Sequence, residues 1–390
     1  MALPSRIQSI DVLRAITMFF MIFVNDVAGV GRIPAWVGHT AAEVDGMGFS
    51  DIIFPAFLFI VGLSLPFAIQ TRINKGDGVL AIAVHILLRS LALIVMGFFH
   101  VNLESYNSEL AGLAKPIYTL LLTTGFFLVW LDYPKESSNL KKYDLTAIGV
   151  ILILAMAYLY KGGNAENPQG LAPHWWGILG LIGWAYLFSA LTYLLTRGKM
   201  WWLFIAFVIY ALINITTHTG LLHVNLWQIG DASSITLMMG GAVIATSYQL
   251  LIVKQQSKKL WLLLSLAGLL CIALGFIVRP YAGGISKIYA TPAWVFICMG
   301  ITILTFQLMI YLVDVKGKKD WFKWIKPAGT STLTCYLIPY VLYATLSLLH
   351  FNYPSLFNEG IGGIIRSFLV AFIVIRIVAL MEKYRIRLKV

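Results

Sequence analysis

Acid–base residues gather in residues 36–51, immediately before a long apolar run. This stretch contains His39, Glu43, Asp45 and Asp51. An imidazole takes or gives a proton near neutral pH, and a carboxylate within reach would orient the ring and raise its basicity. The pattern therefore suits proton transfer with a substrate, and the acidic neighbours would attract a cationic amine. Composition alone favours a plainer interpretation, in which a solvated loop histidine lies among ordinary surface charges.

Further polar residues flank this stretch at the edges of the apolar runs. Asn25 and Asp26 end the preceding run, and Trp36 begins the stretch itself. An asparagine side chain can hold a carbonyl or a sugar hydroxyl group. The loop between the two runs is longer than most connections in this chain, and loops on rigid scaffolds commonly carry binding and catalytic residues. This loop is therefore the main candidate site.

Ionisable residues also occur inside a later apolar run. His85 and Arg89 are four residues apart, so they share one face of a helix. At membrane depth such groups usually face a cavity or a charged partner. Two interpretations stay open: they line a channel for an anionic cofactor, or Arg89 pairs with an acidic residue and locks the helices together. The sequence contains no Ser–His–Asp motif, phosphate-binding glycine loop or metal-ligand spacing, so we expect no metal.

The composition predicts the elements that must position these residues. Of 390 residues, 59% are hydrophobic and 12% are charged, and the mean hydropathy is +0.82. We expect an all-α, polytopic integral membrane protein that forms one transmembrane domain over residues 1–390, without a soluble domain. The pattern predicts about twelve transmembrane helices and is compatible with ten to twelve. They begin near residues 10, 51, 79, 115, 145, 176, 201, 233, 260, 293, 328 and 361.

The distribution of Lys and Arg predicts the orientation of these helices. One set of alternate segments holds 20 Lys and Arg residues, and the opposite set holds only Arg32, Lys115, Lys161, Arg279 and Lys287. Cytoplasmic segments are enriched in basic residues, so both termini are expected in the cytoplasm and the His39 loop on the outer side. The sequence pI of 9.5 then comes from basic residues in the cytoplasmic connections, whose excess the membrane topology explains. We therefore expect no nucleic-acid binding.

The first hundred or so residues carry a recognisable pattern. The chain reads RIQSIDVLRAITMFFMIFVND, and then GHTAAEVDGMGFSDIIFPAFLFIVGLSLPF. These segments resemble the heparan-α-glucosaminide N-acetyltransferase family, in which the opening helix ends in Asn, a loop His follows, and an Asp-x-x-Phe-Pro-x-Phe-x-Phe-x-x-Gly segment begins the next helix. The pattern falls here on Arg6, Ser9, Asp11, Arg14, Asn25, His39, Asp51, Phe54, Pro55, Phe57, Phe59 and Gly62.

The resemblance implies a multi-pass acetyltransferase, most similar to bacterial members and expected in the cell inner membrane. Such enzymes take acetyl-CoA from the cytosol and acetylate the amine of a glucosamine-type sugar on the far side of the membrane. The active-site role carries over to His39, and the helix-end role to Asn25. His39 either acts as the base, which we favour, or takes the acetyl group itself. Asp51 or Glu43 is expected to orient His39 or to bind the sugar amine.

Two groups of residues complete the expected site. The acceptor-binding group lies on the outer side and consists of Asp26, Trp36, Glu43 and Asp45. The group expected to guide the phosphates of CoA consists of Arg89, His85, Arg72 and Lys75.

Two other functions fit parts of the sequence. A secondary transporter would also have about twelve spans and helices broken by Gly and Pro, but it usually shows internal symmetry, which this sequence lacks. An O-acyltransferase of envelope glycans would use a hydroxyl acceptor and would have less need of outer acidic residues. A homodimer is left open.

Overall fold

The computed structural model describes residues 7–390 except 135–137, 222 and 224–225. Almost all of its regular structure is helical, as the sequence predicts. The twelve long helices are α1 (Gln8–Val27), α2 (Ser50–Asn74), α3 (Val79–Asn102), α5 (Lys115–Trp130), α6 (Asn139–Leu159), α7 (Gly177–Leu195), α8 (Met200–His218), α9 (Ser233–Val253), α10 (Ser257–Val278), α11 (Pro292–Met309), α13 (Thr332–Leu348) and α14 (Gly360–Lys383). Their starts match the twelve predicted ones to within a few residues, with the largest differences at α6 and α13.

The remaining elements are short. They are the helices α4 (Ser108–Ala111) and α12 (Lys326–Thr330), the π-helical turn η2 (Ile310–Val315), the 3-10 turns η1 (Trp227–Ile229), η3 (Lys318–Phe322) and η4 (Ser355–Phe357), and the antiparallel pair β1 (Gly162–Gly163) and β2 (Pro168–Gln169). This small hairpin is the whole sheet content of the described ranges.

Nine helices in the described part of the chain are long and apolar enough to cross a membrane. They are α2, α3, α6, α7, α8, α9, α10, α11 with its π-helical extension, and α14. The other three long helices are α5 and α13, which are shorter, and α1, which contains Asp11, Arg14 and Asp26. The protein is therefore an all-α, multi-pass membrane protein.

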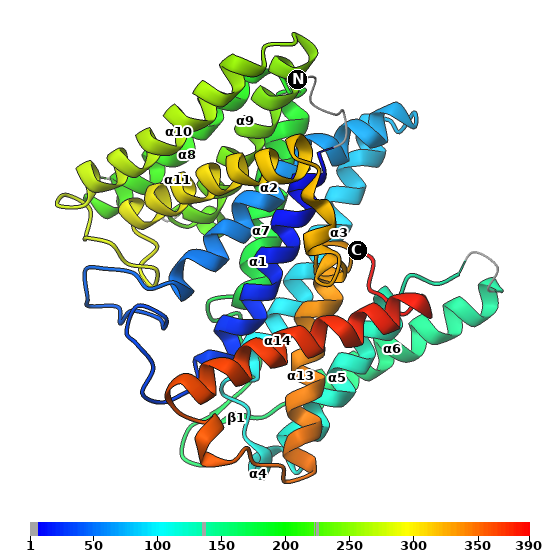
Figure 1. Ribbon diagram of the computed structural model, residues 1–390. Coiled ribbons are helices and arrows are strands. Elements are labelled where there is room, and N and C mark those ends of the chain that lie inside the picture. Colours follow the sequence, from blue (N-terminus) through cyan, green and yellow to red (C-terminus); the bar gives the residue numbers. More distant parts are fainter. Residues whose placement is uncertain (1–6, 135–137, 222, 224–225) are drawn as a thin grey trace.

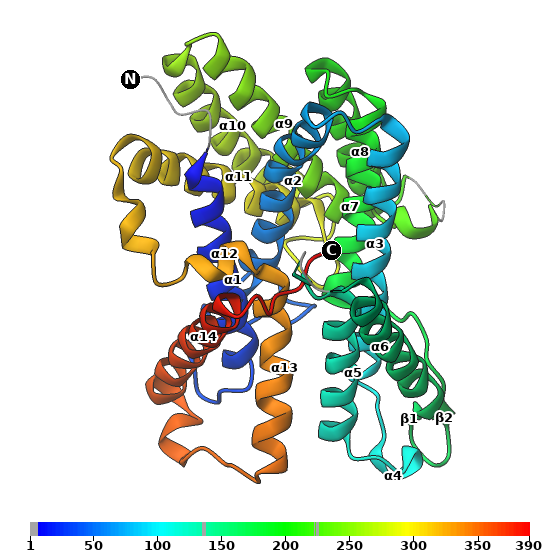
Figure 2. The same ribbon diagram turned by 90° about the vertical axis from the view of Figure 1, so that its right-hand side faces the viewer.

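Helix α1 lies at the centre of the bundle. It packs against α2, α11, α12, α13 and α14. Figure 2 shows α2, α8, α9, α10 and α11 in the upper part of the molecule, and α5, α6, α13 and α14 in the lower part. The C-terminal end of α1 consequently lies where the two groups of helices meet.

Two glycines bring α2 and α9 into close contact. A Cβ atom on Gly62 would lie 1.9 Å from the backbone oxygen of Met238, and one on Gly241 would lie 2.1 Å from that of Phe59. Small residues at helix interfaces let backbones approach, and in lipid this packing is a main source of stability. The contact fixes the relative position of the segments that precede both helices, which carry site residues.

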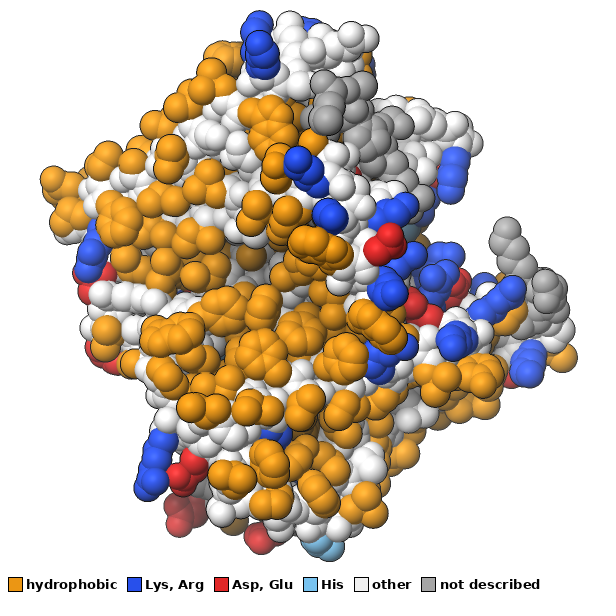
Figure 3. Space-filling model, in the orientation of Figure 1, with side chains coloured by type: hydrophobic (Ala, Val, Ile, Leu, Met, Phe, Trp, Pro, Cys, Tyr) orange, Lys and Arg blue, Asp and Glu red, His pale blue; other side chains and the backbone are white. Residues whose placement is uncertain are grey.

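Contacts between connections agree with the alternation that the Lys and Arg count predicts. The 28–49 and 279–291 connections, on the left in Figure 1, are joined by an Asp45–Arg279 ion pair, and Gly31 forms a bridge with Glu359. At the other end, Asp132 binds Arg387 near the C-terminus. Figure 3 shows most of the visible Lys and Arg side chains on the right of this face, beside a broad hydrophobic surface.

Candidate active site

A cavity of about 750 Å³ lies between the end of α1, the starts of α2 and α9, helix α7 and the 279–291 connection. The side chain of Asn25 lines it from α1, His39 from the first loop and Lys287 from the 279–291 connection. Its size lies in the usual range for small-molecule sites, which are largely apolar with a few polar groups. The cavity is therefore the best candidate for an active site in the described structure.

His39 and Asp51 form a close pair at this cavity. His39 Nδ1 lies 2.7 Å from Asp51 Oδ1, and the Asp51 side chain is 2% exposed whereas that of His39 is 35% exposed. The second carboxylate oxygen accepts hydrogen bonds from the backbone N–H groups of Thr40, at 3.0 Å, and Gly48, at 2.9 Å. Because Nδ1 faces Asp51, Nε2 is the ring nitrogen left to meet a substrate.

The local fold explains how this pair is held. Asp51 lies in the first turn of α2, where the helix dipole stabilises a negative charge. The Ser50 hydroxyl donates to the Val37 carbonyl at 2.6 Å, and the loop backbone pairs again where Phe49 N–H donates to the Trp36 carbonyl at 2.7 Å. The loop is thus closed onto the helix start, and His39 is carried to the cavity by backbone contacts.

Lys287 joins the pair from a distant part of the chain. Its Nζ lies 3.2 Å from His39 Nδ1 and 3.9 Å from Asp51 Oδ1. Burial lowers the pKa of Lys287, and the Asp51 carboxylate opposes this shift. The site therefore has one imidazole between a carboxylate and an ammonium group.

Asp45 holds the connection that carries Lys287. Its carboxylate accepts from Ile285 N–H at 2.7 Å and from Arg279 Nε at 2.9 and 3.1 Å. The hydrogen bond from Ile285, together with Arg279, holds the pKa of Asp45 below its usual value, although burial opposes this shift. Asp45 does not line the cavity, and its contacts join the two loops.

The neighbours Asn25 and Asp26 point in different directions. Asn25 lines the cavity, and its side chain has no hydrogen-bond partner among the described residues. Asp26 is buried, and its Oδ1 accepts from Ser367 Oγ at 2.6 Å and from Arg366 Nη2 at 3.1 Å, while Tyr343 donates to Oδ2. Asp26 thus ties α1 to α13 and α14 and is not brought to the cavity.

The other two residues expected to bind the acceptor also lie outside the cavity lining. The Trp36 side chain is 70% exposed, and Glu43 is exposed on the same loop. The structure therefore brings His39, Asn25 and Asp51 together and leaves Asp26, Trp36, Glu43 and Asp45 around them.

Arg89 lies beside a second, smaller cavity of about 100 Å³, which shares Met21 and Ile178 with the first. Its guanidinium carbon lies 5.0 Å from the centre of the Tyr186 ring, and its buried Nε has no hydrogen-bond partner among the described residues. In the predicted topology Arg89 lies nearer the cytoplasmic end of the bundle than His39 does. A passage from that side toward His39 would run past Arg89.

The other residues expected to guide phosphates lie at the α2–α3 hairpin or close to it. Arg72 Nη1 binds Asp77 Oδ2 at 2.9 Å, and Lys75 is exposed. His85 lies close enough to Arg72 and Arg89 to interact with both electrostatically. None of these three residues, Arg72, Lys75 and His85, lines the first or the second cavity.

Sequence reasoning did not single out several cavity residues. Lys287 and Asp231 line the cavity, as do five tryptophans: Trp175, Trp176, Trp184, Trp227 and Trp294. One signal was available, because Lys287 is among the few basic residues on the predicted outer side. Its approach to His39 depends on a contact between residues 248 positions apart.

Comparisons with known proteins show what this chain is similar to. A family model described as "Domain of unknown function (DUF5009)" matches residues 6–233. Human heparan-alpha-glucosaminide N-acetyltransferase is 34% identical over 101 residues, which are 26% of this chain and 14% of the human protein. The mouse enzyme of the same name is 30% identical over 101 residues, covering 25% of this chain and 14% of its own length.

The matched region thus spans about one-seventh of the length of these relatives. The family model, in contrast, covers more than half of this chain and includes α1, α2 and the His39 loop. The chain belongs to the DUF5009 family and is a relative of the heparan-α-glucosaminide N-acetyltransferases.

Proposed function

We propose that the protein moves an acetyl group from cytosolic acetyl-CoA to the amine of a glucosamine-type sugar on the outer face of a bacterial inner membrane. The observation that carries the proposal is the His39–Asp51 pair at the cavity, with Nδ1 and Oδ1 2.7 Å apart. A carboxylate that fixes one ring nitrogen leaves the other to act as a base, as in other His–Asp catalytic pairs.

In this reaction the acceptor nitrogen forms a bond to the acetyl carbonyl carbon, and the carbon–sulfur bond of the thioester breaks. His39 Nε2 takes a proton from the acceptor nitrogen and returns it to the departing sulfur, so that CoA leaves as a thiol. Asp51 holds the ring in the required tautomer and stabilises the imidazolium that forms between these steps. For a neutral amine acceptor the protons therefore balance with His39 alone, and an acceptor that binds as an ammonium first releases one proton to solvent.

Asn25 and Lys287 supply the remaining polar groups. The Asn25 side chain has a free amide N–H₂ at the cavity and can donate to the acetyl oxygen as negative charge develops on it. Lys287 Nζ lies 3.2 Å from His39 Nδ1, so it competes with Asp51 for that ring nitrogen.

The second cavity supports a route for the donor. The diphosphate end of CoA is too charged to enter hydrocarbon, whereas the uncharged pantetheine arm can pass between helices. The Nε–H group of Arg89 has no hydrogen-bond partner among the described residues beside this cavity. We assign Arg89 to binding either the phosphates of CoA or polar groups of its pantetheine arm.

The test is acetyl transfer by the purified protein in detergent. Release of CoA from acetyl-CoA should depend on added glucosamine and should be lost in His39→Asn. His350→Asn is a matched control, because His350 is an exposed histidine in the α13–α14 connection. A protein that moves the sugar across liposome membranes without consuming acetyl-CoA would be a transporter, and the proposal would fail.

The same protein can show whether the acetyl group rests on the enzyme. We favour direct transfer, because a base held by Asp51 suffices for it. With labelled acetyl-CoA and no acceptor, direct transfer predicts no stable label on the protein. An acetylated His39 would instead establish a covalent intermediate.

A further inference from the structure

The cavity holds one carboxylate that the proposed reaction does not use. Among its described lining residues, the titratable side chains are His39, Lys287 and Asp231, so Asp231 supplies the acidic group. Asp231 lies between η1 and α9, and its side chain is 28% exposed. Its Oδ1 accepts from the Ser233 backbone N–H at 2.9 Å. The Ser233 side chain also hydrogen-bonds to this carboxylate, and the simplest role of Asp231 is to hold the start of α9.

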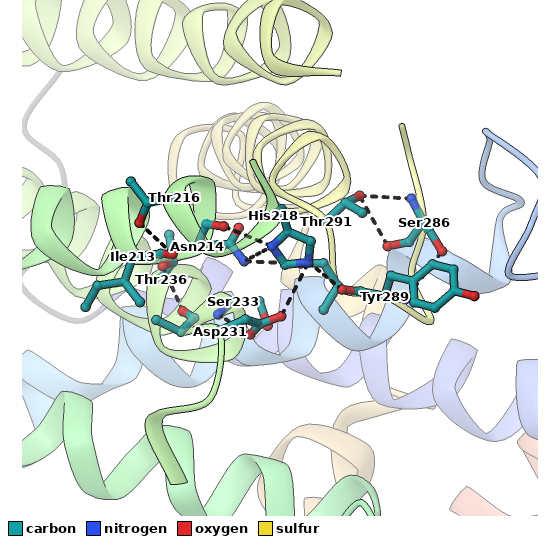
Figure 4. Close-up of polar contacts among 12 residues, drawn as sticks. Ile213, Asn214, Thr216, His218, Asp231, Ser233, Thr236, Ser286, Tyr289 and Thr291 are labelled. Carbon is teal, nitrogen blue, oxygen red and sulfur yellow. Dashed lines mark hydrogen bonds and ion pairs between the residues drawn. The ribbon is translucent and has the colours of Figure 1, made fainter. Parts of the chain in front are cut away.

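His218 lies on the other side of Asp231. Figure 4 shows the His218 ring between α8 and the 279–291 connection. Its Nε2 donates to the Tyr289 carbonyl at 2.8 Å, and its Nδ1 lies 2.9 Å from the Asn214 carbonyl. Asp231 Oδ2 is 3.8 Å from Nε2, which is too long for a hydrogen bond. The carboxylate therefore keeps capacity to accept from a ligand.

Among the described residues, the ion-pair partner of Asp231 is His218, at 3.8 Å, and no Lys or Arg pairs with this carboxylate. Burial raises the pKa of Asp231, and hydrogen bonds from Ser233 together with the interaction with His218 oppose the shift in part. A bound cation would restore the stabilisation that burial removes.

The backbone on both sides of Asp231 is in an unusual conformation. Gly230 has φ +56° and Ala232 has φ +59°, in the left-handed region that residues with a Cβ rarely adopt. Such backbone is retained where the surroundings require it, often at functional sites. Here it accompanies a sharp turn from η1 into α9 at the cavity wall.

Tryptophans cover the wall next to Asp231. Trp227 belongs to η1 and is 68% exposed, and Trp175 is 45% exposed. The Trp184 ring lies between Trp176 and Trp227, with ring centres 5.6 and 5.3 Å apart. Indole faces attract ammonium groups and also pack against apolar faces of a ligand. A suitable ligand would have an amine and a ring with one apolar face that packs on these indoles.

We propose that Asp231 binds the protonated amine of the acceptor, a hexosamine whose ring packs on Trp227 and Trp175, and that this contact selects amines over hydroxyl acceptors. The inference rests on the proposed function and deepens it. Attack needs the neutral amine, so the bound ammonium first releases one proton to solvent. Of the two hydrogens left on the nitrogen, one passes through His39 to the departing sulfur, and the other can donate to Asp231 during attack. His218 acts as a positioning residue for the carboxylate.

Binding in the absence of acetyl-CoA tests the inference separately from catalysis. Ligand-detected NMR titrations would compare glucosamine with glucose, its neutral counterpart, on wild-type protein in detergent. We expect glucosamine to bind about 10-fold more tightly than glucose, in line with a charge-assisted contact. In Asp231→Asn this preference should disappear, while Glu166→Gln, which changes an exposed acid outside the cavity, should keep it.

Kinetics provide the second readout. In Asp231→Asn the KM for glucosamine should rise about 10-fold or more with the KM for acetyl-CoA unchanged. Asp231→Glu keeps the charge and should restore part of the preference, which separates a lost charge from a folding defect. Equal binding of glucosamine and glucose by the wild type, or an unchanged preference in Asp231→Asn, would overturn the inference. An Asp231-dependent preference without acetyl transfer would instead refute the proposed function and leave the amine site standing.

Discussion

Lys287 Nζ lies 3.2 Å from His39 Nδ1, the same nitrogen that lies 2.7 Å from Asp51 Oδ1. This nitrogen can donate to the carboxylate or accept from the ammonium group, but it cannot do both. The first arrangement leaves Nε2 as a base at the cavity, and the second leaves Nε2 as a proton donor. The contact between Lys287 and His39 therefore helps to decide whether Nε2 can accept a proton from a substrate.

Replacing Lys287 with methionine should change the pH dependence of the reaction. Burial lowers the pKa of Lys287, so its ammonium group is lost as the pH rises into the alkaline range, and His39 Nδ1 is then left to donate to Asp51. We expect kcat/KM of the wild type to rise over this range and that of Lys287→Met to lack the rise. Lys161→Met, which alters an exposed lysine on the same predicted side, should keep the rise.

Replacing Asp51 with asparagine should lower kcat far more than it raises either KM. The amide can no longer hold the Nδ1–H tautomer or stabilise the imidazolium, and comparable changes cost about 10⁴-fold in a serine protease. We expect a loss of about 100-fold or more, measured as CoA release with both substrates saturating. Asp144→Asn, which makes the same change at an exposed residue of α6, is the matched control. A kcat within a factor of about two of wild type would exclude a role for Asp51 in holding the base.

The buried Arg366–Asp26 pair should matter for stability and little for acceptor binding. The two side chains are 11% and 3% exposed, so Arg366→Met leaves a buried carboxylate without its cation. We expect a loss of about 3 kcal/mol, seen as a lower Tm in detergent. Arg32→Met, which breaks an ion pair with 83% and 52% exposed side chains, should cost less than about 1 kcal/mol. A raised KM for glucosamine in correctly folded Arg366→Met would instead return Asp26 to the acceptor site.

Widening the α2–α9 contact should damage both fold and site. Gly62→Ala introduces a Cβ 1.9 Å from the Met238 backbone oxygen, so the helices must separate. We expect a lower Tm, equivalent to about 2 kcal/mol or more, together with reduced activity. Gly46→Ala has no atom within 4 Å of the new Cβ and should behave like wild type.

Arg89 should contribute to donor binding. Arg89→Gln removes the charge beside the second cavity, and the KM for acetyl-CoA should rise about 10-fold while the KM for glucosamine stays the same. Arg72→Gln should have a smaller effect, because Arg72 is already paired with Asp77. The opposite order would move the phosphate site to the α2–α3 hairpin.

The sequence by itself determined the helical architecture. Long apolar runs must form helices in a membrane, because no water is present to satisfy the backbone, and so the positions of the twelve long helices followed from hydropathy alone. The alternation of Lys and Arg also grouped the connections correctly, as the contact between Asp45 and Arg279 shows. The close approach of His39 and Asp51 was within reach of sequence reasoning, since only twelve positions separate them.

Tertiary structure decided the rest of the site. Asp26 and Asn25 are adjacent in sequence, yet one binds Arg366 in α14 and the other lines the cavity, because successive helical residues face different neighbours. Lys287 and Asp231 reach the cavity through loops whose course depends on contacts between remote helices, such as Gly62 of α2 against Met238 of α9. Hydropathy and charge act on each segment separately, whereas the cavity exists only where five segments meet. Only the packed bundle could therefore identify the acidic group, the ammonium group and the tryptophans around His39.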